Sequence, residues 1–504
     1  MSLTRRQFLK RSATLAAGAT VAPAMKWLPG TGVAYAAGPS DAIVVFVQFY
    51  GGNDGLNTVY PVTDGSGTQR TKYEEYRPTL KLPKVMGELS PWTTEGFDTS
   101  NGVLDVGPDT TGAHYALHPS MKAMHDIYLD GKLAVVPGIH YPYADYSHFR
   151  SEVIYYTGDP IGTGGLGWMG KYLDYYGYTP TQVPAVMLNN SYSPLFTPTQ
   201  TSLFAFNSLR ELRFPAGSLA DQRSAAFSSM YAESAASSAL SFPELVNIGD
   251  TGVAAILKFG EYFHNGTGGM DDSGKVATLM LDGDGQYHSY NDLAYDSPLN
   301  STNMQFRQTN LHQDLRHVAA TIRADVGARF FHVGIGGFDT HSNQENGFYH
   351  SYLLNQMSEA IGAFWAEMRN SSASLPAGYL SGDISDRVLI VTLSEFGRTN
   401  KQNTDSASSA GTDHGRASVH FVVGSTVQAG VHGEYPTLDD PDLDDDMRPT
   451  HDFRDFYGTI LERWLNVPVP VIGPGAGKFF AATPTPDWLG QSYTAYNAIP
   501  FLLP

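Results

Sequence analysis

The sequence predicts an α/β fold, a doubly wound and mostly parallel sheet with helices on both faces and with loop insertions. Two observations predict it. Short apolar runs alternate along the chain with segments of helical periodicity, which is typical of βαβ units. Acidic and histidine side chains follow several of these runs, where an open α/β sheet places its ligand-binding groups. We therefore expect one large domain with its site at the strand ends.

The predicted strands are continuous apolar runs, as expected of strands buried on both faces. They cover residues 43–49, 133–136, 185–188, 329–334, 388–393 and 419–423. Helices are predicted where apolar residues recur at helical spacing. They cover residues 118–131, 219–240, 350–369 and 453–465.

Two stretches break this alternation. Residues 62–112 are rich in Thr, Gly and Pro, and residues 265–310 are rich in Gly, Asp and Asn. Long connections without periodicity are usually surface excursions or cover a site. We expect both to be insertions, and the second can also form a cap over the site.

The N-terminus resembles a twin-arginine export signal. Thr4-Arg5-Arg6-Gln7-Phe8-Leu9-Lys10 is followed by an apolar stretch at 13–24 and by the small residues Ala34-Tyr35-Ala36. This predicts a signal peptide at 1–36, one domain at 37–504, and export in the folded state to the periplasm or beyond. A basic, disordered tail is the alternative. The apolar stretch is too short for a permanent anchor, and no later segment reaches 18 apolar residues, so no transmembrane anchor is expected in the mature chain.

The chain is acidic and has no cysteine. Its formal net charge is −18, and removal of the five basic residues within 1–36 would take it to −23. Such a charge disfavours nucleic acid as a partner and suits cation binding. The lack of cysteine excludes disulfides, thiolate metal sites and a cysteine nucleophile. Small-molecule or polysaccharide esters remain as substrates, and the oligomeric state is left open.

Asp339, His341, Asp413 and His414 are candidate metal ligands. Asp339 and His341 follow the strand predicted at 329–334. Being two apart, they would point the same way on a strand and could share one ion. The alternative is a turn with His341 exposed. His414 is predicted as a ligand, and Asp413 either as a ligand or as the group that orients the histidine.

Asp54, Glu395 and Arg398 also follow predicted strands. Asp54 comes after two glycines and Asn53, so it is either a ligand or part of a tight turn. Glu395 and Arg398 are three residues apart, and they either pair with each other or act separately. In the second case Glu395 binds a metal and Arg398 clamps an oxyanion.

Ser147 is the candidate nucleophile. A metal ion could lower the pKa of its hydroxyl for attack on an ester, and the alternative is an N-cap of a helix that runs to Tyr156. Arg150 or Arg398 would stabilise the developing charge. A Ser-His-Asp triad is disfavoured because Ser147 lacks a Gly-x-Ser-x-Gly elbow.

A series of short motifs resembles the exported bacterial family called domain of unknown function 1501 (DUF1501). The motifs span most of the chain in order: 51–58, 118–119, 147–149, 167–170, 336–341, 394–399, 413–415 and 451–455. The resemblance implies the alkaline phosphatase and sulfatase superfamily, with its doubly wound fold. It also implies one or two divalent ions (Zn, Mn, Mg or Ca) at the strand ends.

On the superfamily plan, Asp54 is an early ligand and Ser147 the nucleophile. Asp339 with His341 forms an Asp-His pair, and His414 is a late ligand. Glu395 takes the position of the carboxylate in a carboxylate-His pair, but Phe396 replaces the histidine of that pair. The second metal site would therefore lack one of its expected ligands. The sulfatase maturation motif is absent, so a formylglycine sulfatase is not expected.

These observations give two hypotheses of function. The first is an exported metal-dependent hydrolase of phosphate or sulfate esters that uses Ser147 or a metal-activated water. The second is a non-catalytic, degenerate relative that binds metal or glycan in an envelope or matrix. Retention of the candidate ligands favours the first hypothesis, and Phe396 favours the second.

Overall fold

The structure is a computed structural model. It describes residues 41–82, 103–161, 165–178, 184–188, 193–198, 203–206, 310–323, 325, 327–345, 349–371, 380–438, 445–475, 477–483 and 492–503. The chain divides into two compact units, Met1–Ala36 and Ala37–Pro504, and all described residues belong to the second. The predictions for residues 1–36, for the helix at 219–240 and for nearly all of 265–310 lie outside the described residues.

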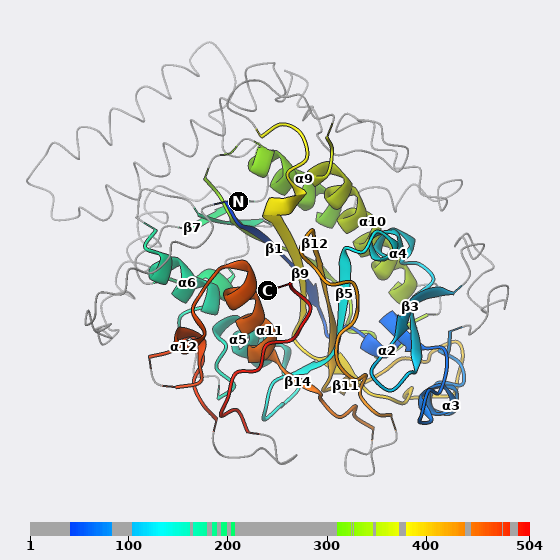
Figure 1. Ribbon diagram of the computed structural model, residues 1–504. Helices are drawn as coiled ribbons and strands as arrows, with labels where there is room; N and C mark the ends of the chain where they lie inside the picture. The colour runs from blue at the N-terminus through cyan, green and yellow to red at the C-terminus, as the bar shows by residue number, and fades with distance from the viewer. Residues whose placement is uncertain are drawn as a thin grey trace, which may run out of the picture. The chain divides into compact units, whose positions relative to one another are not determined.

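A nine-stranded sheet with strand order β13-β5-β12-β9-β1-β8-β6-β7 forms the centre of this unit, and β14 pairs with β5 (Figure 1). Its strands are β1 (Ile43–Tyr50), β5 (Leu133–His140), β6 (Ala185–Leu188), β7 (Leu203–Phe206), β8 (Phe330–Gly336), β9 (Val388–Ser394), β12 (Ser418–Gly424), β13 (Gly430–Val431) and β14 (His451–Asp452). β1 runs parallel to both β8 and β9, whereas β12 runs antiparallel to β5 and β9. The predicted α/β class with a mostly parallel sheet is therefore confirmed.

Side chains of β1 alternate between two hydrophobic cores, which explains its unbroken apolar run. Val45 and Val47 belong to a core shared with α4 (Lys122–Leu129), α9 (Asn310–Arg323) and α10 (Tyr349–Met368). Val44 and Phe46 belong to a core shared with α5 (His148–Thr157), α6 (Trp168–Tyr176) and α11 (Phe453–Thr459). Helices thus cover both faces of the sheet, with α10 matching the helix predicted at 350–369.

Smaller elements connect these layers. A three-stranded sheet has the order β2-β4-β3, and β10 pairs with β11. Their bounds are β2 (Val59–Pro61), β3 (Leu104–Pro108), β4 (His114–Leu117), β10 (Gly397–Arg398) and β11 (His414–Gly415). The short helices are α2 (Gly55–Thr58), α3 (Gln69–Tyr76), η3 (Pro194–Phe196), η6 (Ser385–Arg387), η7 (Ile460–Trp464) and α12 (Val469–Ile472). Within the stretch 62–112, the described part thus contributes α3 and β3 and is not structureless.

None of the described helices combines the length and the apolar character that a membrane crossing requires. The helix predicted at 453–465 is present as α11 followed by the π-helical turn η7.

Two core histidines make stability depend on pH. His332 on β8 and His420 on β12 are buried, and burial lowers their pKa values to about 4 and about 3. Above the unfolded pKa of about 6.5 both are neutral in both states. As the pH falls below that value, only the unfolded chain takes up the protons. Each histidine should therefore reduce the free energy of unfolding by up to about 1.4 kcal/mol per pH unit between pH 6.5 and 4.

This prediction can be checked by urea unfolding at pH 8, 6 and 5 for the wild type and for His332→Leu. The variant should lose less stability than the wild type over that range, whatever its stability at pH 8. Parallel pH profiles would contradict the assignment of a proton uptake to His332.

Candidate metal centre

The loops that follow three neighbouring strands meet at one edge of the sheet. Because β8 and β9 flank β1 in parallel, their carboxyl ends lie beside the carboxyl end of β1. Residues 51–54, 337–341 and 395–398 leave the sheet there, and β11 and the start of α5 contact them. Most of the predicted site residues are thereby brought together.

Arg398 links these loops through hydrogen bonds. Its fully buried guanidinium donates to the backbone carbonyls of Gly51, Gly52, Phe338 and Thr412 and to Asp339 Oδ1, the last at 2.6 Å. These contacts commit Arg398 to holding Asp339 and the surrounding loops, which differs from the oxyanion clamp that the sequence suggested.

Three imidazoles at this edge have their Nδ1 atoms next to oxygen acceptors. His148 Nδ1 lies 2.9 Å from Glu395 Oε1, His341 Nδ1 lies 2.7 Å from Asp413 Oδ1, and His414 Nδ1 lies 3.0 Å from the Tyr146 carbonyl. A carbonyl or a carboxylate only accepts, so each Nδ1 carries the proton. Each Nε2 is then left with a lone pair, as in the carboxylate–histidine–metal arrangements of metalloproteins.

The three lone pairs converge on Asp339. Its Oδ1 lies 3.0 Å from His414 Nε2 and 3.1 Å from His341 Nε2, and its Oδ2 lies 3.6 Å from His148 Nε2. His341 Nε2 and His414 Nε2 are 3.0 Å apart, and His148 Nε2 is buried without a hydrogen-bond partner in the described structure. Ligand atoms of a tetrahedral ion at about 2.0–2.1 Å lie about 3.3 Å apart, so the distances of Asp339 from the three rings are compatible with shared coordination. The ligand atoms of His148, Asp339 and His414 all lie within 4.8 Å of one another.

The electrostatics agree with a cation at this position. Burial acts to raise the pKa of Asp339, but the hydrogen bond from Arg398 and the positive charge of its guanidinium oppose this, and the pKa is lowered to about 2. Burial lowers the pKa of His414, which disfavours an extra proton on its ring. The hydrogen bond to Glu395 raises the pKa of His148, so an ion that binds Nε2 would have to displace the extra proton of this ring. His148, Asp339 and His414 thus form a group that could hold a metal ion, and His341 extends it.

Glu395 acts through His148. Its carboxylate is fully buried and accepts from His148 Nδ1, from the Gly51 N–H at 2.7 Å and from Gln48 Nε2 at 3.4 Å. It therefore orients the imidazole, in a position that differs from the direct ligand that the sequence suggested. Asp413 does the same for His341, which was one of the two roles predicted for it.

The Phe396 ring packs against the rings of two of the histidines. Its buried ring lies 4.8 Å from the His148 ring and 4.6 Å from the His414 ring, centroid to centroid. The histidine next to Glu395 is His148, which comes from α5 and not from the adjacent position in the chain.

Asp54 lies in a separate, fully buried ion pair. Its carboxylate receives two hydrogen bonds from Arg77, of which Nη2 to Oδ1 is 2.9 Å, and a third from Gln344. Burial acts to raise the pKa of Asp54, and the charge of Arg77 outweighs it, so the pKa is lowered. Arg77 also donates to the carbonyls of Thr399 and Asn400, so Asp54 supports the loops rather than joining the Asp339 group.

Ser147 and Arg150 lie exposed at the start of α5. Ser147 precedes His148 directly, and its side chain makes no capping hydrogen bond. Its backbone N–H donates to Asp145 Oδ1. Arg150 pairs with the same aspartate at 3.0 Å. Both side chains are thus at the surface, one on each side of His148 in the chain.

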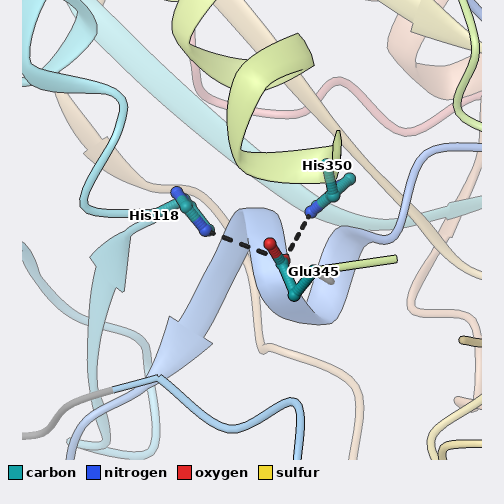
Figure 2. A group of neighbouring side chains, drawn as sticks. All are labelled: His118, Glu345 and His350. Atoms are coloured by element: carbon teal, nitrogen blue, oxygen red, sulfur yellow. Dashed lines mark hydrogen bonds and ion pairs between the residues drawn. The ribbon is translucent and has the colours of Figure 1, made fainter. Parts of the chain in front are cut away.

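A second group, His118, Glu345 and His350, is completely buried (Figure 2). His350 Nδ1 and His118 Nε2 lie 3.3 Å and 3.8 Å from Glu345 Oε1, and Ser351 Oγ donates to Oε2 at 2.6 Å. His118 Nδ1 accepts from the Ser120 N–H at 3.1 Å, so the proton of a neutral His118 must sit on Nε2. Burial keeps this ring neutral by lowering its pKa to about 4. With that proton, His118 Nε2 faces its neighbours as a donor, and the group is a hydrogen-bond network.

Sequence reasoning did not assign several of these residues. His148 entered the sequence analysis only within the family motif at 147–149, and its distance from Asp339 along the chain gives no signal. Arg77 lies in a stretch without periodicity. His118 was visible only as part of a family motif, and Glu345 and His350 carried no recognisable pattern.

The family model described as "Protein of unknown function (DUF1501)" matches residues 41–485 of the chain. No curated protein and no solved structure matches significantly.

Loss of Arg77 should strongly destabilise the fold. Arg77→Met leaves the Asp54 carboxylate buried without its countercharge, so we expect a loss of about 3–5 kcal/mol in urea unfolding. Lys72→Met in α3, the helix that ends just before Arg77, removes a charge whose partner Glu75 is exposed, and should cost no more than about 1 kcal/mol. Similar values for the two variants would contradict the role of the buried pair.

The two histidine groups should respond differently to zinc. His148→Ala and His414→Ala should each weaken Zn²⁺ binding by at least about a hundredfold in calorimetric titration, because each removes a lone pair. His118→Ala should lower stability and leave zinc affinity within about threefold of the wild type, because its Nε2 carries a proton. Zinc binding that depends on His118 and not on His414 would reverse the assignment.

Proposed function

Because the chain belongs to DUF1501, a family of unknown function, we propose its activity from the site itself: an exported, metal-dependent hydrolase of phosphate or sulfate esters. The observation that carries the proposal is the convergence of three imidazole lone pairs and one carboxylate at a half-exposed position. Titratable groups gathered in this way are typical of functional sites.

The residues present fit a first-row divalent ion. His148, His341 and His414 would bind it through Nε2 and Asp339 through its carboxylate. Three nitrogen donors and one oxygen donor suit zinc better than magnesium or calcium, which prefer oxygen ligands. Glu395, Asp413 and the Tyr146 carbonyl would hold the three rings in this orientation.

Ester hydrolysis at this site requires a bound cation and a path for the substrate from solvent. A divalent ion bound here supplies Lewis acidity and lowers the pKa of a water or hydroxyl nucleophile. The side chains of Asp339 and His341 are 47% and 45% exposed, so a substrate can reach them from the surface. Ser147, exposed beside His148, is the protein nucleophile that we propose, and water is the alternative.

The start of α5 supports an anionic substrate. A helix N-terminus favours negative charge, and α5 begins directly after Ser147. Arg150 adds a positive charge at the same exposed position. These features favour an ester that carries negative charge, as phosphate and sulfate esters do.

One observation favours the alternative, a protein that binds metal without catalysis. Phe396 fills the space next to Glu395 with an apolar ring, so the described residues offer ligands for one ion at this edge. Many two-metal hydrolases need both ions. Activity measurements therefore have to separate binding from turnover.

Purified mature protein loaded with zinc should hydrolyse at least one 4-nitrophenyl ester in a screen of phosphate monoesters, phosphate diesters and sulfates. Asp339→Asn should abolish both zinc binding and hydrolysis. Ser147→Ala should retain zinc and lose about a hundredfold or more in rate if the serine attacks.

An unchanged rate in Ser147→Ala would assign the attack to water. Stoichiometric zinc with no hydrolysis of any ester in the screen would favour the non-catalytic alternative. A wild-type protein that binds no divalent ion would refute both.

A further inference from the structure

Glu152 is placed to act on a substrate at the metal centre. It lies on α5 four residues after His148, so the two side chains share one face of the helix. Side chains on a helix lean toward its N-terminus. We therefore expect the Glu152 carboxyl group to lie toward His148, and the charges of His148 and Glu395 both act on it.

The surroundings of Glu152 favour its protonated form. The side chain is half-buried, with Tyr50, Tyr156 and Glu395 as neighbours, and it forms no hydrogen bond or ion pair with another described residue. Burial raises its pKa to about 7, and the negative charge of Glu395 adds to that rise, whereas His148 opposes it. A carboxyl group that titrates near neutral pH, and has no fixed hydrogen-bond partner, can serve as a general acid.

We propose that Glu152 donates the proton to the leaving-group oxygen when an ester is cleaved at the Asp339 metal centre. This inference rests on the proposed function and adds a second catalytic residue to it. The geometry that carries it is the shared helix face of Glu152 and His148, together with the partial exposure of the Glu152 side chain.

The step balances as an ordinary hydrolysis. The bond between phosphorus or sulfur and the leaving oxygen breaks, and its electron pair stays on that oxygen. The proton of Glu152 moves to the same oxygen, so the product leaves as a neutral alcohol. If water attacks, a new bond forms to its oxygen and the proton that it releases restores Glu152. If Ser147 attacks, it releases its hydroxyl proton, a water then cleaves the Ser147 ester, and the two released protons restore Ser147 and Glu152.

The dependence on the leaving group tests this role. Alcohols and phenol depart poorly without a proton, whereas 4-nitrophenolate departs readily as an anion. In the zinc-loaded protein, Glu152→Gln should therefore lose about a hundredfold or more in kcat/KM on phenyl phosphate or phenyl sulfate. On the matching 4-nitrophenyl ester it should lose no more than a few-fold.

Two control variants complete the experiment. Glu152→Asp keeps the acid on a shorter side chain and should recover part of the rate on the phenyl ester. Glu434→Gln makes the same change at an exposed position in the loop after β13 and should behave as the wild type. Zinc content should be equal in all of these proteins.

The outcomes separate the inference from the function beneath it. An equal loss on both esters would assign Glu152 a structural role, and no loss on either would leave it without any role, so both results overturn the inference. A wild type that cleaves neither ester of phosphate or sulfate refutes the proposed function first, and the inference falls with it.

Discussion

The arrangement of this site depends on one buried cation, the guanidinium of Arg398. A guanidinium removed from water is stable only when nearby acceptors replace its hydration. Here the acceptors are carbonyls of the loops after β1 and β8 and of the segment before β11, together with Asp339. The loops must therefore meet at Arg398, and this brings Asp339 to His341 and His414. Gly51 makes the approach possible, since a Cβ there would lie 2.4 Å from the Asp339 nitrogen.

The positions of protons then distinguish two groups that look alike in composition. Each has two histidines and a carboxylate within a few ångströms. At the strand ends every Nδ1 faces an acceptor, which leaves the Nε2 lone pairs facing one another. In the buried group a backbone N–H faces His118 Nδ1, and this forces the proton onto Nε2. By proximity alone, the two groups would be equally good candidates for a metal site. The partner of each histidine Nδ1 distinguishes them, because it determines whether Nε2 has a lone pair or a proton.

The sequence predicted the parts of the fold that local pattern determines. Apolar runs located β1, β8 and β9 closely, and helical spacing located α10. Asp339 and His341 were paired by an argument about strand alternation, but β8 ends at Gly336, and the two residues meet in a loop that Arg398 shapes. His148 could not be found in this way, because its partner Glu395 lies 247 residues away in the chain. Arg77 could not be found either, because it pairs with Asp54 across 23 residues that carry no periodic pattern. Long-range hydrogen bonds leave no local trace in one sequence.

The two arginines near the site have opposite environments, and this separates their roles. Arg398 is fully buried with its donors directed at backbone carbonyls and Asp339, so it cannot move to meet a substrate without disrupting the loops. Arg150 is exposed, and its ion pair with exposed Asp145 is of the kind that contributes at most about 1 kcal/mol. A substrate anion can replace that carboxylate at little cost. If Phe396 restricts the centre to one ion, the remaining charge of an ester must be met by Arg150 and the start of α5. Under the proposed function, the surface arginine, and not the buried one, is then the group available to meet a substrate anion.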